Sequence, residues 1–206
     1  MPWRGLMHSY FAYTGIISSI WIVVGIYTAS LFYPNYSHKK QFCSELGALG
    51  SPTQKLSPII NNYPLSLLFS IFGTFLLHSS LTFSFDYFIG LLIIVHGLGT
   101  FIAGYFPMDK DPYTNTPTLS CQIHSYAGLF MMLSLLFAPI VAALDEAYPA
   151  WLRVFSSVCA LGCIVFSVTL AKAFKQKNNP GLHQRFSYGF QIIWLFVFSI
   201  FIIKNT

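Results

Sequence analysis

A carboxylate and a histidine flank a short loop in this otherwise nearly uncharged sequence. Asp109 ends the stretch 104–109 (GYFPMD), and His124 lies just inside the next apolar run. Such a pair can act as general acid and base, or both groups can coordinate a divalent cation. Ionisable groups at a membrane interface are costly unless they have a partner or a role. We therefore expect Asp109 and His124 to lie close together as catalytic residues, with Asp109 orienting His124.

Further polar residues lie in loops or within about one turn of a predicted helix end on the same side. Glu45 is a third candidate metal ligand beside Asp109 and His124, and Arg185 could hold a phosphate through paired hydrogen bonds. In the alternative interpretation Asp109 only braces a turn and Arg185 only extends toward lipid headgroups. The predicted ligand-binding residues are Ser44, Glu45, Asn62 and Arg185.

The spacing of potential ligands gives weak support for a metal centre. The sequence contains neither an HExxH nor a CxxC motif, so ligands for a divalent metal would have to come from distant elements. Haem is disfavoured, because His78 and His124 are expected toward opposite ends of antiparallel helices. We interpret His78 and His96 as hydrogen-bonded core histidines. The cofactor therefore stays undetermined.

The elements that position these residues are membrane helices. Of the 206 residues 55% are hydrophobic and 8% are charged, whereas soluble domains carry about a quarter charged residues. Six apolar runs reach or approach the ~20 residues needed to span a bilayer. The sequence predicts an all-α polytopic bundle forming one domain over 1–206. Its six helices are expected at about 10–32, 63–83, 86–106, 119–143, 150–173 and 186–203.

The distribution of basic residues predicts orientation. The net charge is +5, but eight Lys and Arg lie on the side of loop 34–62 and three on the other side. Lys and Arg are enriched on the cytoplasmic side of membrane proteins. We expect a multi-pass protein of the plasma membrane (the bacterial inner membrane), with loop 34–62 cytoplasmic and both termini outside. Nucleic acid is not an expected partner, and protein partners are left open.

Small residues recur along several predicted helices. Gly90, Gly97 and Gly104 follow a heptad spacing, and Ser66 and Ser70 lie one turn apart on the preceding helix. Membrane helices associate through such stripes because small side chains allow close approach. We expect packing surfaces, and a lined cavity is the alternative.

Several short motifs together resemble a known family. They are Ser44 to Gly47 (S-[DE]-L-G), Asn62, a G-x-F-P-x-D ending at Asp109, His124, and Arg185 in a G-L-x-Q-R context. The chain resembles bacterial and archaeal six-helix integral membrane proteins of unknown function, and the resemblance spans nearly its whole length. It implies the six-helix fold and this set of residues, but no reaction.

The leading hypothesis is a protein that binds or processes a membrane lipid or amphiphile headgroup at a polar pocket on the side of loop 34–62. A catalytic version would be metal-assisted or general-base hydrolysis or acyl transfer through His124, and whether the protein is an enzyme stays open. The alternative is a small transporter or flippase, or a structural membrane subunit without catalysis. A transporter predicts that polar residues continue past His124 through His96 or His78, whereas an enzyme predicts a pocket closed at one end.

Overall fold

The chain folds into six long α-helices and two short helical turns, and no strand occurs among the described residues. This computed structural model describes residues 3–78 and 85–205, with side chains from residue 10 onward. All six helices are long and apolar enough to cross a membrane, which confirms the predicted all-α, multi-pass membrane fold. The helices are α1 (Trp3–Leu31), α2 (Tyr63–His78), α3 (Asp86–Tyr105), α4 (Leu119–Leu144), α5 (Ala150–Lys175) and α6 (Pro180–Asn205), and the turns are η1 (Cys43–Gly47) and η2 (Pro58–Asn62).

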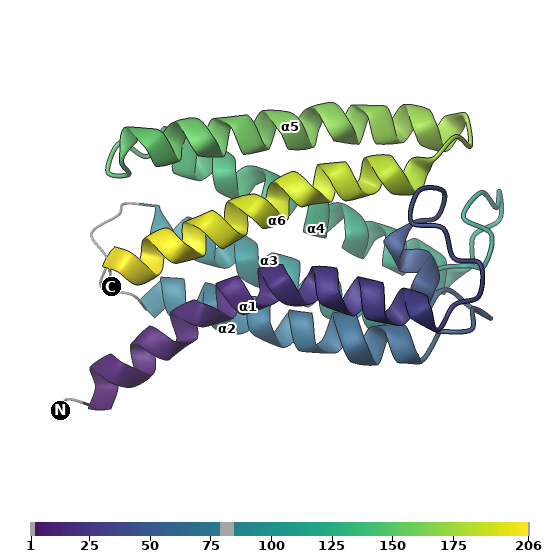
Figure 1. Cartoon of the computed structure of the whole chain (residues 1–206), viewed down its shortest axis with the longest axis horizontal. Helices are drawn as coiled ribbons and strands as arrows, with labels where there is room; N and C mark the ends of the chain where they lie inside the picture. Colours follow the sequence, from purple (N-terminus) through teal and green to yellow (C-terminus); the bar gives the residue numbers. More distant parts are fainter. Residues whose placement is uncertain (1–2, 79–84, 206) are drawn as a thin grey trace.

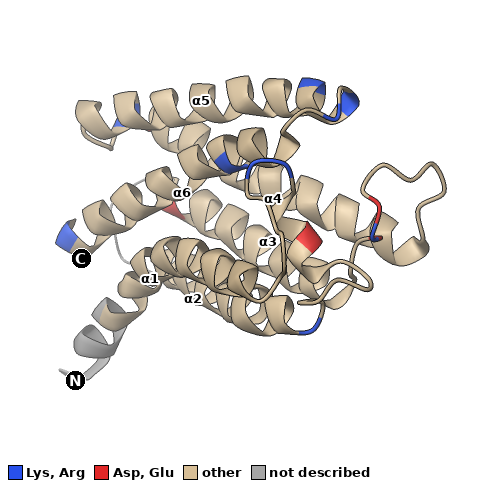
Figure 2. Ribbon diagram, turned by 45° about the vertical axis from the view of Figure 1, so that its right-hand side comes forward, with Lys and Arg blue, Asp and Glu red and all other residues tan. Residues whose placement is uncertain are grey.

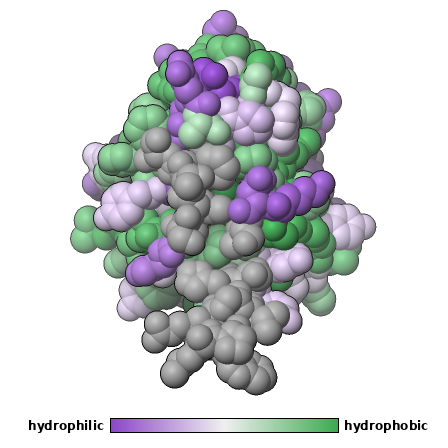
Figure 3. All heavy atoms as spheres, turned by 90° about the vertical axis from the view of Figure 1, so that its left-hand side faces the viewer, coloured by the Kyte–Doolittle hydropathy of each residue, from purple (hydrophilic) through white to green (hydrophobic). Residues whose placement is uncertain are grey.

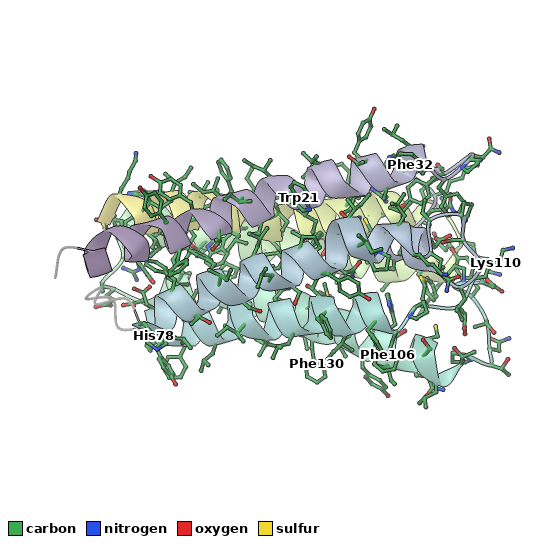
Figure 4. All side chains as sticks on the ribbon, turned by 90° about the horizontal axis from the view of Figure 1, so that it is seen from below. Trp21, Phe32, His78, Phe106, Lys110 and Phe130 are labelled. Carbon is green, nitrogen blue, oxygen red and sulfur yellow. The ribbon has the colours of Figure 1, made fainter. Side chains whose placement is uncertain are left out.

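Successive helices run in alternating directions along one bundle (Figure 1). The connections 32–62, 106–118 and 176–179 lie at one end of the bundle, termed here the loop end. The start of α1 and the end of α6 lie at the opposite end, termed the termini end. Figure 4 shows Lys110 at the loop end and His78 at the termini end. Lys and Arg gather at the loop end and are sparse along the helices (Figure 2).

Two helix starts differ clearly from those expected. The predicted end of the second helix, residues 79–83, lies outside the described residues. α1 begins at Trp3 rather than at residue 10, and no proline interrupts it before its end at Leu31. α6 begins at Pro180 rather than at residue 186. Proline is well suited to the first position of a helix, where its missing N–H is not needed. Arg185 therefore lies in the second turn of α6.

The glycine stripe of α3 is a packing surface against α2, as predicted. A Cβ built on Gly90 would lie 2.8 Å from the Gly73 carbonyl oxygen, and one on Gly97 would lie 3.0 Å from the Ser66 carbonyl oxygen. Larger side chains at these positions would push the two backbones apart. The stripe thus holds α2 and α3 together as a close antiparallel pair.

Large apolar side chains fill the interior and cover the flanks. Phe72, Leu135 and Phe198 are fully buried in the central core, and Trp194 donates from Nε1 to Ser156 Oγ at 2.9 Å. Phe130 points outward and is 58% exposed, as expected for a side chain that faces lipid (Figure 4). At the termini end, hydrophilic residues form separate patches among hydrophobic ones (Figure 3). The bundle therefore has an apolar centre and apolar flanks, with polar groups near its ends.

Candidate functional site

A cavity of about 420 Å³ lies inside the loop end of the bundle. Residues of α1, η1, η2, α3, α4 and α6 contribute to its wall, and none of its lining residues is Lys, Arg, Asp or Glu. Ile22, Leu65, Met131 and Met132 supply apolar surface between the polar side chains. The cavity combines hydrocarbon walls with uncharged hydrogen-bonding groups.

His124 enters this cavity from the first turns of α4 with its tautomer fixed. Its Nδ1 lies 2.9 Å from the carbonyl oxygens of both Ala103 and Phe106, at the end of α3. Carbonyl oxygens only accept, so Nδ1 must carry the hydrogen, and in the neutral ring Nε2 then carries the lone pair. Within the described residues, Nε2 of His124 has no hydrogen-bond partner. His124 can therefore accept a hydrogen bond or a proton from a molecule in the cavity.

Asn61 also lines the cavity and contains a second unsatisfied group. It belongs to η2, a single turn of π-helix, whose Ile60 carbonyl accepts a hydrogen bond from Trp21 Nε1 at 2.7 Å. Asn61 is 6% exposed, and its Oδ1 is buried without a hydrogen-bond partner. Gly25 of α1 makes room for this side chain, because a Cβ there would overlap Asn61 Oδ1. Single π turns are frequent at functional sites, and a buried polar atom without a partner requires an explanation.

Three of the predicted site residues line the cavity: Ser44, Asn62 and His124. Asn62 donates from Nδ2 to the Thr100 carbonyl oxygen at 3.2 Å, which ties η2 to α3. A Cβ on Gly104 would lie 2.5 Å from Cβ of Asn62, so this close packing requires glycine. Three of the six predicted site residues therefore share the cavity wall, and Glu45, Asp109 and Arg185 do not belong to it.

The expected pair of Asp109 and His124 is not formed. Asp109 instead accepts hydrogen bonds from Thr118 N at 2.9 Å and Thr118 Oγ1 at 2.7 Å, just before α4. Thr118 Oγ1 in turn accepts from Cys121 N and caps the helix. These bonds from Thr118 hold the pKa of Asp109 below its usual range. The contacts of Asp109 agree with the alternative interpretation, in which it braces a turn. Backbone carbonyls, rather than Asp109, orient His124.

Glu45 also braces a loop and does not line the cavity. Its carboxylate accepts from Phe42 N at 2.8 Å and from Gln41 Nε2 at 3.1 Å, at the start of η1. No group of three His, Cys, Asp or Glu side chains gathers as potential metal ligands in the part of the chain that the structure describes. The three candidate ligands Glu45, Asp109 and His124 thus do not form a metal-binding set here.

Arg185 fastens the first loop to the start of α6. Its Nη1 donates to the carbonyl oxygens of Gln41 and Gly181, both at 2.9 Å, and its Nη2 donates to Tyr36 Oη at 2.8 Å. Leu182 N also donates to the Lys39 carbonyl at 2.9 Å. Burial is the main cause that raises the pKa of Tyr36. Together these contacts hold the loop across the mouth of the bundle.

In the layer of the bundle next to the cavity, the ring nitrogens of His96 are both bonded to protein groups. His96 is fully buried, with Nδ1 2.9 Å from the Met131 carbonyl oxygen and Nε2 3.1 Å from Tyr188 Oη. This confirms His96 as a hydrogen-bonded core histidine. The same interpretation is wrong for His78, which is exposed and, among the described residues, bonds to the Thr74 carbonyl of its own helix at 2.9 Å. Neither histidine belongs to the described residues that line the cavity.

Sequence reasoning missed polar residues on one face of α6. Gln184 accepts from Cys43 N at 2.8 Å, and Gln191 donates to the Met132 carbonyl at 2.8 Å. Together with Tyr188 they line the cavity. Their spacing of four and three residues in an otherwise apolar helix is a signal that identifies a polar inward stripe. Asn61 stands beside the predicted Asn62 in the sequence, but the π turn that positions it is not readable from local sequence.

Comparison with protein families gives one result that covers most of the chain. A family model described as "Protein of unknown function (DUF998)" matches residues 16–200. Comparison with curated proteins gives no match, and comparison with solved structures gives none either. The match includes α2 to α5 in full, the larger part of α1 and of α6, and every residue that lines the cavity. The chain therefore belongs to the DUF998 family of membrane proteins, whose function is unknown.

Proposed function

We propose that this protein binds a membrane amphiphile and holds its uncharged polar portion in the loop-end cavity. One observation carries the proposal: His124 lines the cavity with a ring nitrogen, Nε2, that has no hydrogen-bond partner among the described residues, and Asn61 in the same wall has a buried amide oxygen without one. Buried polar groups in proteins are normally satisfied, so these groups are suited to a ligand that supplies the missing hydrogen bonds.

The lining favours one class of polar group. A hydroxyl or an amide N–H can donate to His124 Nε2, and hydroxyls, ester carbonyls and amides can bond to the side-chain amides of Asn61 and Gln184. A free anion would find no Lys or Arg among the lining residues. Ile22 and Met132 offer apolar surface to the adjoining hydrocarbon. The volume falls within the range of roughly 300–1,000 Å³ found for small-molecule sites. The glycerol and ester region of a lipid has this combination of properties.

A monoacylglycerol tests the proposal. Monoolein would be titrated into purified protein in detergent, and binding followed by calorimetry. His124→Leu should weaken binding by about tenfold, the effect of losing one good hydrogen bond. His78→Leu is the matched control, because His78 is an exposed histidine at the other end of the bundle. Equal affinity of wild type and His124→Leu would contradict the proposal.

Catalysis on the bound amphiphile is a second candidate. It is favoured by the uncommitted Nε2 of His124 and by the Ser44 hydroxyl, which line the same cavity. A histidine in this tautomer can act as general base for hydrolysis or acyl transfer. Release of oleate from monoolein by wild type, and its loss in both His124→Leu and Ser44→Ala, would support it. Wild type that leaves monoolein intact would reject an esterase activity toward this probe.

For the setting of the site we propose the plasma membrane, with the loop end in the cytoplasm. The proposal rests on the excess of Lys and Arg at this end. A membrane-impermeant amine reagent should then leave Lys39 unlabelled in intact cells and label it after permeabilisation. Labelling of Lys39 in intact cells would reverse the orientation.

A further inference from the structure

A second hollow, termed here the α1/α6 groove, runs along the outside of the bundle. It has a volume of about 590 Å³ and lies between residues 19–27 of α1 and 188–196 of α6. Its rim includes Val23 and Ile193, which are 64% and 53% exposed. In a membrane such a rim faces lipid, so the groove is open sideways to the hydrocarbon.

The groove has the length of one lipid chain region. From Arg185 to Phe196, α6 rises by about 16 Å at 1.5 Å per residue. The hydrocarbon core of a bilayer is ~30 Å thick, so one leaflet occupies about half of it. The groove therefore extends from the loop end to roughly the middle of the membrane.

The positive charge of Arg185 lies at the loop end of the groove. It has no acidic partner among the described residues. Arg185 lines the groove, and each of its three recorded hydrogen bonds goes to an uncharged oxygen: two carbonyls and the Tyr36 hydroxyl. These bonds leave Nε–H and one hydrogen of Nη2 for another acceptor. His38 lines the groove nearby, and burial together with the charge of Arg185 lowers its pKa. An anionic group is the electrostatic complement of this position.

The groove and the cavity share part of their walls. Ile22, Ile26, Cys43 and Tyr188 line both hollows. A molecule in the groove thus lies one side chain away from the polar groups of the cavity.

We propose that the α1/α6 groove is the lateral entry and chain-binding site for an anionic membrane lipid, whose acidic group is held by Arg185. The acyl chain lies between α1 and α6, and the glycerol region lies against Tyr188, in the wall that the groove shares with the cavity. This inference rests on the proposed amphiphile-binding function and adds to it the charge of the ligand and the direction of entry.

Two glycines allow the two hollows to be filled independently. A Cβ on Gly189, in the groove, or on Gly128, in the cavity wall on α4, would have no other heavy atom within 4 Å. The Cβ of a leucine at either position therefore enters open space. Gly189→Leu obstructs the groove, and Gly128→Leu is the matched control that narrows the cavity from the α4 side.

The experiment uses the full chain in phosphatidylcholine nanodiscs. The probe is phosphatidic acid with a photoactivatable diazirine on one acyl chain, and phosphatidylcholine with the same chain is the comparison probe. Labelled peptides should come from residues 19–27 and 189–196, with the phosphatidic acid probe preferred by about tenfold, the effect of one charge-assisted hydrogen bond. Gly189→Leu should reduce this labelling to background, and Gly128→Leu should leave it in place.

Other results overturn the inference. These are labelling of α4 around Gly128 in place of α1 and α6, equal labelling by the two probes, or labelling that survives Gly189→Leu. Because Arg185 also holds the first loop, the Gly189 variant keeps the test independent of loop structure. Monoolein affinity, measured separately with His124→Leu, reports on the cavity alone. Failure of the groove and failure of the cavity are thus distinguishable.

Discussion

Two neighbouring layers of the bundle each contain a histidine, and they use it in opposite ways. In both, Nδ1 lies 2.9 Å from backbone carbonyl oxygen, of Met131 for His96 and of Ala103 and Phe106 for His124. The Nε2 of His96 is occupied by Tyr188, with Phe69 packed edge-on at 4.6 Å, whereas the Nε2 of His124 has no partner among the described residues. The same side chain is a structural element where all its groups are bonded and a candidate functional group where one is left for a ligand.

The largest loss of stability is expected from a substitution in the layer of His96. His96→Leu removes both hydrogen bonds of a fully buried ring and leaves Tyr188 Oη and the Met131 carbonyl without this partner. The free energy of unfolding should fall by about 2–4 kcal/mol, since unsatisfied buried groups are costly. Thermal unfolding in detergent measures it. A loss no greater than that of His78→Leu would show that His96 is not a structural element.

Breaking the contact between the first loop and α6 should give the next largest loss of stability. A Cβ on Gly181 would overlap the Gln41 carbonyl oxygen, so Gly181→Val forces the first loop away from α6. We expect a loss of about 1–3 kcal/mol, the usual range for overpacking. Trypsin should also cut faster after Lys39 and Lys40. Gly189→Val, in open space, is the control, and similar cleavage of both variants would refute the role of this contact.

A substitution in the layer of His124 should lower the free energy of unfolding much less. His124→Leu loses only the Nδ1 hydrogen bonds, so unfolding should become easier by about 1 kcal/mol, the net value of one hydrogen bond. The comparison predicts that this loss is smaller than that of His96→Leu, while monoolein binding weakens by about tenfold. The reverse order of the two stability losses would invalidate the distinction between the layers.

The smallest loss of stability should come from Asp109→Asn, and this local loss should depend on pH. The folded-state pKa of Asp109 is lowered by hydrogen bonds from Thr118, so its stabilisation is present at neutral pH. It is lost as pH falls from about 4, the unfolded pKa, through the lower folded value. Amide exchange at 118–121 should be faster in the variant at pH 7 and should converge with wild type at low pH. A difference that persists at low pH would exclude the carboxylate as its cause.

The fold was predictable because each helix is a long apolar run, but its details depended on tertiary contacts. α6 starts six residues early because Pro180 begins the helix, although an Asn-Pro sequence is typical of a chain break. In the candidate site, residue type and place in the chain correctly brought His124 to the loop end. They could not show that Thr118 would satisfy Asp109, or that main-chain oxygens would bind Arg185. Such partners depend on three-dimensional packing, which local sequence does not encode.

The fastening of the first loop to α6 has a consequence for biosynthesis. Cys43 and its partner Gln184 are 141 residues apart. At translation rates of roughly 5–20 residues per second, the loop waits about ten seconds or more before its partner is made. During that time the candidate site is incomplete and the basic loop lacks its attachment to the last helix. Only a chain whose last helix has been inserted can form the contact between Cys43 and Gln184, so this contact reports that membrane insertion is complete.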